Sequence, residues 1–152
     1  MERKAKTLIE RFGFVDPDRE KPSHDQIQIW VYNNFPMIVR RVFPSVEVEN
    51  YLPLDIKLEY PVSDQRNFVV GFIDVYCRKL SIGIEIKSEI PRLGDLVRQI
   101  QYYRKYVTGS WIVVSPDDRS AGILIDQGIH FFKYDNSMAN NQLELFQSFH
   151  TG

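Results

Sequence analysis

Two carboxylates and a lysine could form a reactive site because their spacing places them on neighbouring strands. Asp74 lies in the apolar run 68–77, and Glu85 and Lys87 lie in the run 81–87, with ten residues between the two acids. Strand side chains alternate between faces, so Glu85 and Lys87 share one face while three isoleucines take the other. Carboxylate oxygens beside an ammonium group suit a hard cation such as Mg²⁺ or Mn²⁺. The sequence therefore predicts a metal site suited to phosphodiester cleavage.

The strand that carries Asp74 is apolar at nearly every position, which indicates that both of its faces are covered. A buried acid is costly unless it is paired or bound to a metal. The alternative is an ion pair of Lys87 with Glu85 or Asp74 on a solvated sheet face. That alternative agrees less well with the apolar character of both strands.

The arrangement of Asp74, Glu85 and Lys87 across a hairpin resembles the core of the PD-(D/E)XK nuclease superfamily. Ile73 stands where the family usually has a proline. A Gln-x-x-x-Tyr pattern follows in residues 99–103, as in RecB-type nucleases and the nuclease domains of type I restriction enzymes. Its glutamine and tyrosine lie one helical turn apart and project from one face.

The resemblance implies a restriction-endonuclease-like α/β fold. Its mixed sheet core has the order helix–three strands–helix–strand and is flanked by helices. The resemblance also implies that Asp74 and Glu85 are metal ligands, with the carbonyl of Ile86 as a third protein oxygen. Lys87 would orient the attacking water or stabilise the developing charge.

Other polar residues have roles that the sequence leaves open. Gln99 and Tyr103 are implied to act at the site, but tyrosines on an amphipathic helix can also be core aromatics with solvated hydroxyls. His24 and Asp25 occupy the region where family members often supply an additional ligand, and helix capping is the alternative. Glu59 could enter the site or face solvent, and alternation does not decide between these.

Basic residues are concentrated around the candidate site although the chain has a net charge of −1. Residues 78–105 contain seven basic side chains against three acidic ones. Such an excess suits phosphate binding, whereas the alternative is that each residue simply solubilises a hairpin or a helix end. The predicted nucleic-acid contacts are Arg78, Lys79, Arg92, Arg98 and Arg104.

Length and composition indicate one domain, residues 1–152, with a sizeable core. The one cysteine, Cys77, excludes a disulfide framework and a cysteine-only zinc or iron–sulfur site, and it is expected to be a buried structural thiol. The charged N-terminus does not resemble a signal peptide, and no apolar run has the length of a membrane span. We therefore expect an intracellular, cytoplasmic protein without membrane contact.

Periodicity and turn signals predict the elements that hold these residues. Residues 1–22 are expected to form a short helix (2–12) and a proline-containing linker, and residues 135–152 a polar tail. Ser23 is the expected N-cap of the next helix. Helices are predicted at 24–35, 37–43, 92–107 and 116–126, and strands at 56–62, 68–77, 81–87, 110–115 and 129–134.

The sequence thus predicts a magnesium- or manganese-dependent deoxyribonuclease, a hydrolase that binds DNA and acts as an endonuclease in preference to an exonuclease. One domain carries one active site, so double-strand cleavage requires a homodimer, a higher oligomer or two events. The sequence contains no Walker motif, so any translocation must come from a separate motor subunit. The alternatives are a nuclease-fold module that binds nucleic acid or protein without catalysis, and a nuclease subunit of a motor complex.

Overall fold

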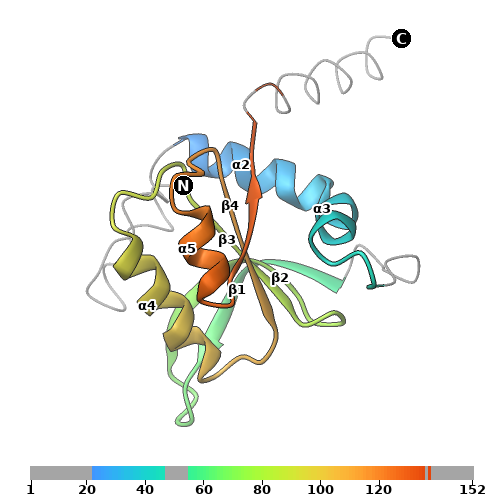
Figure 1. The fold of residues 1–152 in the computed structure, drawn as a ribbon. Coiled ribbons are helices and arrows are strands. Elements are labelled where there is room, and N and C mark those ends of the chain that lie inside the picture. Colours follow the sequence, from blue (N-terminus) through green and yellow to red (C-terminus); the bar gives the residue numbers. More distant parts are fainter. Residues whose placement is uncertain (1–21, 47–54, 136, 138–152) are drawn as a thin grey trace.

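The computed structural model describes residues 22–46, 55–135 and 137, which form a mixed α/β fold around one five-stranded sheet (Figure 1). The strands lie side by side in chain order. Each of the first three is antiparallel to its neighbour, and the last two run parallel to the third. They are β1 (Ile56–Ser63), β2 (Val69–Cys77), β3 (Ile82–Ile86), β4 (Ser110–Ser115) and β5 (His130–Lys133). The predicted mixed α/β class is confirmed.

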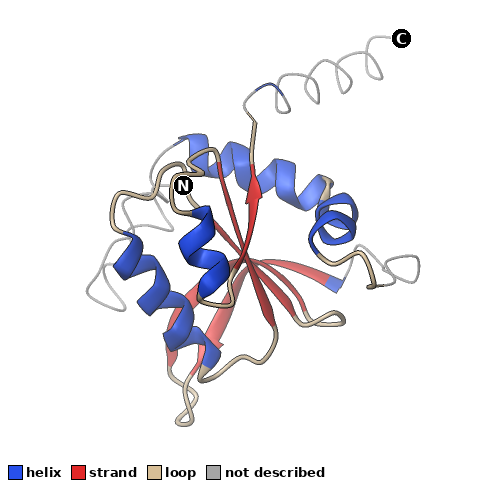
Figure 2. Cartoon of the chain, viewed as in Figure 1, coloured by secondary structure: helices blue, strands red, loops and turns tan. Residues whose placement is uncertain are grey.

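Helices cover both faces of the sheet, as Figure 2 shows. One face carries α2 (Pro22–Asn33) and α3 (Phe35–Val42), and the other carries α4 (Leu93–Arg104) and α5 (Ala121–Asp126). A helix follows the β1–β3 meander and leads back to β4, so α4 is the crossover between parallel strands. Within the described ranges, no helix has both the length and the apolar character needed to cross a membrane.

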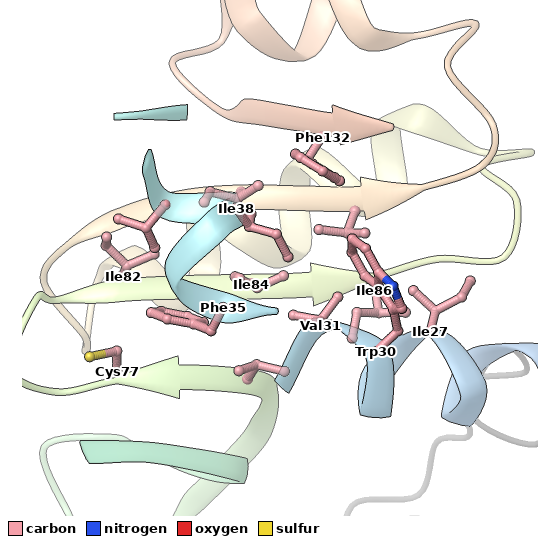
Figure 3. Close-up of a cluster of buried hydrophobic side chains, with 14 of the residues drawn as sticks. Ile27, Trp30, Val31, Phe35, Ile38, Cys77, Ile82, Ile84, Ile86 and Phe132 are labelled. Atoms are coloured by element: carbon pink, nitrogen blue, oxygen red, sulfur yellow. The ribbon is translucent and has the colours of Figure 1, made fainter. Parts of the chain in front are cut away.

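Each face of the sheet packs into its own core. The isoleucines of β3 pack against the helices α2 and α3 (Figure 3). The opposite face packs against α4 and α5. The first core includes Ile27, Trp30, Val31, Phe35, Ile38, Ile56, Val75, Cys77, Ile82, Ile84, Ile86, Ile112 and Val114. The second includes Val62, Ile73, Tyr76, Leu96, Ile100, Tyr103, Trp111, Val113 and Leu124.

The predicted helices 24–35 and 37–43 are present as α2 and α3, with their ends shifted by one or two residues. The chain breaks at Asn34, whose amide side chain donates to the Trp30 carbonyl at 2.8 Å. Pro36 lies in the first turn of α3, where a missing N–H costs nothing. The prediction that Ser23 caps the helix is wrong, because α2 already includes Ser23.

The predicted helix 116–126 is wrong in its first half, since α5 begins at Ala121. The Asp117 amide donates to Ser115 Oγ at 3.0 Å, and Asp117 Oδ1 accepts from the Arg119 amide at 3.3 Å. These local side-chain bonds favour a turn over a helix. The predicted N-terminal helix and linker, and nearly all of the polar tail, lie outside the described residues.

Candidate functional site

The paired part of β2 and β3 ends beside the predicted acids. Its last rung joins Val75 to Ile84, and one further step of the same antiparallel register would set Asp74 opposite Glu85. There, Asp74 Oδ2 accepts a hydrogen bond from the Ile86 amide at 2.8 Å. The Asp74 carboxylate therefore contacts the backbone of β3 immediately after Glu85.

Strand β1 changes face at Glu59. Ile56 and Val62 are six residues apart, so a regular strand would place both on one face. Instead, Ile56 belongs to the core under α2 and α3, and Val62 belongs to the core under α4 and α5. Glu59 has a φ of 52°, the left-handed conformation that non-glycine residues seldom adopt. This conformation accounts for the change of face.

Strand β2 changes face opposite that point, at Asp74. Ile73 and Tyr76 both pack in the core under α4 and α5, although residues three apart in a regular strand face opposite sides. The pairing of β1 with β2 continues on both sides of this point but lacks the rung between Glu59 and Asp74, and its register shifts further along, between Val62 and Ser63. The uniform alternation expected for this strand is therefore wrong at Asp74. Its carboxylate lies at the point where the strand turns over.

Buried polar side chains are concentrated at this point. Among the described residues, and apart from tyrosine, tryptophan and cysteine, five polar or charged side chains are buried, and four of them belong to this region: His24, Gln28, Asp74 and Glu85. Asp74 and Glu85 each have 0% relative exposure. Acidic side chains are almost never fully buried without specific interactions. Their burial agrees with the prediction that both faces of these strands are covered.

At the start of α2, His24 contacts the Asp74 carboxylate and Asp25 contacts the other side of the His24 ring. His24 Nε2 lies 3.2 Å from Asp74 Oδ1, and His24 Nδ1 lies 3.4 Å from Asp25 Oδ1. A protonated imidazole could donate to both carboxylates. The structure thus brings His24 directly to the site and connects Asp25 to it through the imidazole ring.

Gln28 belongs to the site although the sequence did not identify it. Its Nε2 donates to the Asp74 carbonyl oxygen at 2.9 Å and to Glu59 Oε1 at 3.0 Å. Gln28 lies one helical turn after His24, so both project from the same side of α2. This spacing of four residues is the feature of the sequence that could have identified Gln28. The same bonds settle the question about Glu59, whose side chain enters the site.

Glu85 lies on the opposite side of β3 from the isoleucines, as predicted. The same side of the strand carries Gly83, where an added Cβ would come within 3.1 Å of the Trp111 ring. Lys87 follows the end of β3 and is half-buried, and its amide donates to the Val114 carbonyl at 3.0 Å. The backbone therefore stays attached to β4 as far as Lys87.

Asp117 anchors the connection that follows Lys87. Its Oδ2 accepts from the Ile90 amide at 2.8 Å, and both carboxylate oxygens accept from the Arg119 guanidinium, at 2.8 and 2.7 Å. The Arg119 guanidinium, followed by the Ile90 amide, holds the pKa of Asp117 well below its usual range. Through these bonds, Asp117 fixes the loop that follows Lys87 to the end of β4.

Asp117→Asn is expected to lower the free energy of unfolding at pH 7 by about 1–2 kcal/mol. Because the folded-state pKa is lowered, this contribution is present above the unfolded pKa of about 3.9 and is lost as the pH falls further. The stability difference between wild type and variant should therefore shrink below about pH 4. Urea unfolding across this range measures it, with the exposed Asp126→Asn as control. Equal stabilities at pH 7 would contradict this role.

Gln99 and Tyr103 contact each other on α4, since Gln99 Nε2 donates to Tyr103 Oη at 3.3 Å. Tyr103 is only 3% exposed, and its ring centroid lies 5.9 Å from that of Trp111. A Cβ at Gly71 would come within 2.3 Å of Tyr103 Oη, so the hydroxyl lies directly over β2. Tyr103 therefore lies in the core under α4 and α5, next to the strand that carries Asp74, and the half-buried Gln99 contacts its hydroxyl.

Gln99→Ala and Tyr103→Phe are expected to lower cleavage activity by about 10–100-fold. Tyr103→Phe keeps the ring that packs on Trp111, so its melting temperature should stay close to that of wild type. Cleavage rates and thermal melts of the same preparations measure both effects. Unchanged specific activity with a melting temperature several degrees lower would instead assign the pair to the core alone.

Three of the predicted DNA contacts are exposed residues outside the helices and strands. Arg78 and Lys79 form the turn between β2 and β3, and Arg92 directly precedes α4. The turn is four residues from Asp74 along β2, or about 13 Å of extended chain.

The other two predicted DNA contacts have partners within the fold. Arg98 forms an ion pair with Asp95 one turn earlier on α4. Arg104 Nη2 donates to the Gly128 carbonyl at 2.7 Å, which ties the end of α4 to the segment between α5 and β5. Arg104 therefore has a structural contact in addition to the predicted one.

Cys77 is fully buried, as predicted for a structural thiol. Burial raises the pKa of this thiol, which keeps it in the protonated, unreactive form.

The donor chemistry at Asp74 and Glu85 fits a magnesium ion. Within residues 22–46, 55–135 and 137, no three His, Cys, Asp or Glu side chains form a group that could hold a metal by themselves. The predicted ligand set contains two such side chains and the carbonyl of Ile86. Mg²⁺ usually retains several waters and is bound through one or two protein carboxylates. The two buried acids therefore supply the number and type of charged ligands that Mg²⁺ usually has.

Comparisons of the chain with models of protein families, with characterised proteins and with solved structures gave no match.

Proposed function

We propose that this protein is a metal-dependent DNA nuclease with a restriction-endonuclease-like fold, which hydrolyses phosphodiester bonds with Mg²⁺ or Mn²⁺. The observation that carries the proposal is the concentration of buried polar side chains, His24, Gln28, Asp74 and Glu85, where β2 and β3 separate. The antiparallel meander, the crossover helix and the returning parallel strand support it, because the sequence resemblance implies that order.

Asp74, Glu85 and the carbonyl of Ile86 would hold the metal ion. When bound, the ion lowers the pKa of a water molecule and offsets negative charge on the phosphate. Asp74 is held for this task by His24 Nε2 at 3.2 Å and by the Ile86 amide at 2.8 Å. A carboxylate fixed from two sides keeps its oxygens in place, which avoids a cost of reorganisation during the reaction.

Lys87 would supply positive charge to the reacting phosphate or orient the attacking water. Its backbone is fixed to β4 by the bond from its amide to the Val114 carbonyl. Its side chain is half-buried, and partial exclusion of water strengthens the attraction between an ammonium group and a phosphate. His24 and Asp25, the residues considered as additional ligands, would instead support Asp74, because His24 contacts its carboxylate and no three His, Cys, Asp or Glu side chains of the described residues form a group that could hold a metal.

The same proposal includes DNA as the substrate and an intracellular, cytoplasmic location. It also includes assembly as a homodimer or with a separate motor subunit. The exposed Arg78, Lys79 and Arg92 would contact the phosphate backbone. A second copy of the chain would supply the second active site needed to cut both strands in one event.

A second candidate function is a nuclease-fold module that binds nucleic acid or protein without cutting it. The observation that favours it is that both oxygens of Asp74 already have protein partners, His24 Nε2 and the Ile86 amide. A carboxylate held in this way can serve the fold alone. In a catalytic site, the same contacts orient a ligand.

Incubation with linear, circular, single-stranded and branched DNA distinguishes the two functions. The nuclease proposal expects products with Mg²⁺ or Mn²⁺, no products with EDTA, and binding without turnover in Ca²⁺. Binding in all metals without any product would support the non-catalytic module and contradict the nuclease.

A further inference from the structure

We propose that Gln28 and Glu59 are positioning residues that set the place of the Asp74 carboxylate. This inference rests on the proposed nuclease function, which gives Asp74 its role as a metal ligand. Gln28 Nε2 bridges Glu59 Oε1 at 3.0 Å and the Asp74 carbonyl oxygen at 2.9 Å. The bridge spans the place where the rung between Glu59 and Asp74 is missing from the pairing of β1 with β2.

The orientation of the Gln28 amide follows from its two partners. Both are oxygen acceptors, and only the NH₂ end of the amide can donate two hydrogen bonds. The buried Asp74 carbonyl lies where no β1–β2 rung pairs the backbone, so Gln28 supplies it with a donor. A buried carbonyl that loses its donor destabilises the fold, so a side chain without a donor at position 28 cannot replace the glutamine amide.

Glu59 holds its strand in an unfavourable conformation at this bridge. A left-handed backbone is unfavourable for a non-glycine residue, and such residues are concentrated at functional sites. At φ 52°, Glu59 turns β1 over, and its side chain accepts the hydrogen bond from Gln28. The Gln28 amide thus connects the two points at which β1 and β2 change face.

The consequence for the site is the direction of the Asp74 side chain. From α2, Gln28 holds the Asp74 carbonyl and His24, one turn earlier, contacts the Asp74 carboxylate. The carboxylate then lies at 2.8 Å from the Ile86 amide, beside Glu85. If the bridge is lost, the Asp74 carbonyl loses its donor from α2, and the carboxylate of the same residue is free to shift from its place beside the Ile86 amide.

Gln28→Met, which is similar in size but lacks the donor, tests the bridge. We expect kcat for DNA cleavage to fall about 10–100-fold with little change in KM, and Mn²⁺ binding measured by electron paramagnetic resonance to weaken by a similar factor. We also expect faster hydrogen exchange at the Ile86 amide, which reports the place of the carboxylate without any metal. Asp126→Asn, which changes an exposed carboxylate on α5 outside the site, is the control and should retain wild-type values.

The exchanged pair Gln28→Glu with Glu59→Gln separates positioning from stability. The new amide at position 59 can donate to the new carboxylate at position 28, so the melting temperature should recover relative to Gln28→Glu alone. The Asp74 carbonyl then faces a carboxylate instead of a donor. Turnover, Mn²⁺ binding and Ile86 exchange should therefore stay impaired in the exchanged pair.

Recovery of turnover together with the melting temperature in the exchanged pair would show a purely structural bridge and overturn the inference. The same holds if Gln28→Met has wild-type kcat, Mn²⁺ affinity and Ile86 exchange while the wild type is active. If the wild type itself neither cuts DNA nor binds Mn²⁺, the proposed function fails, and the inference fails with it.

Discussion

Replacement of Asp74 by asparagine is expected to slow DNA cleavage on the order of 1,000-fold, or about 4 kcal/mol in activation free energy. Asparagine keeps the size and one oxygen but removes the charge that would attract the metal. Glu85→Gln and Lys87→Ala should have effects of the same order, because each removes one of the groups that act on the same phosphate. The measurement is the single-turnover rate on labelled DNA with excess protein.

A matched control is Asp126→Asn, which removes an exposed carboxylate on α5. This variant should cut at the wild-type rate, and all variants should show wild-type far-ultraviolet circular dichroism. A protein with Asp74, Glu85 and Lys87 all replaced by alanine that still cuts DNA at the wild-type rate would show that the site lies elsewhere.

Magnesium is expected to raise the melting temperature of the protein by about 5–10 °C at one hundred times its dissociation constant. Mass action supplies about 2.7 kcal/mol at that concentration, and 1 kcal/mol corresponds to about 2–4 °C in a domain of this size. The physical reason is that the ion relieves the repulsion between two fully buried acids, Asp74 and Glu85, which Lys87 offsets only in part.

Glu85→Gln should remove most of this magnesium response and raise the stability of the metal-free protein. Neutralising one of two buried acids removes their mutual repulsion. Asp74→Asn is the less suitable variant for this purpose, because it also takes the partner from His24. A thermal melt across a magnesium titration measures both effects. An unchanged melting temperature up to concentrations that support cleavage would contradict a preformed metal site.

The sheet could be predicted because apolar alternation and turn signals mark each strand. The isoleucines of β3 and the opposite placement of Glu85 follow directly from a period of two. Strand and helix ends shifted by a few residues, since local side-chain bonds decide them. Asn34 divides α2 from α3 and Asp117 delays α5, and neither effect is visible in hydrophobic periodicity.

The part of the site that the sequence did not reveal depends on contacts between distant segments. Gln28 reads as an ordinary polar residue of a helix, yet it is 4% exposed and bonded to residues 31 and 46 positions away. The left-handed Glu59 is likewise invisible in sequence, because glutamate does not favour that conformation and only its surroundings maintain it. Asp74 and Glu85 were predictable because acids in apolar strands are rare.

The most direct test of the central claim compares the wild type with Glu85→Gln in one experiment, on supercoiled plasmid and labelled linear DNA, with Mg²⁺, Mn²⁺, Ca²⁺ or EDTA. The proposed site predicts cleavage by the wild type in Mg²⁺ or Mn²⁺, binding without cleavage in Ca²⁺, and no product from the variant in any metal at equal protein concentration. Equal cleavage by wild type and variant, or cleavage that persists in EDTA, would contradict the account.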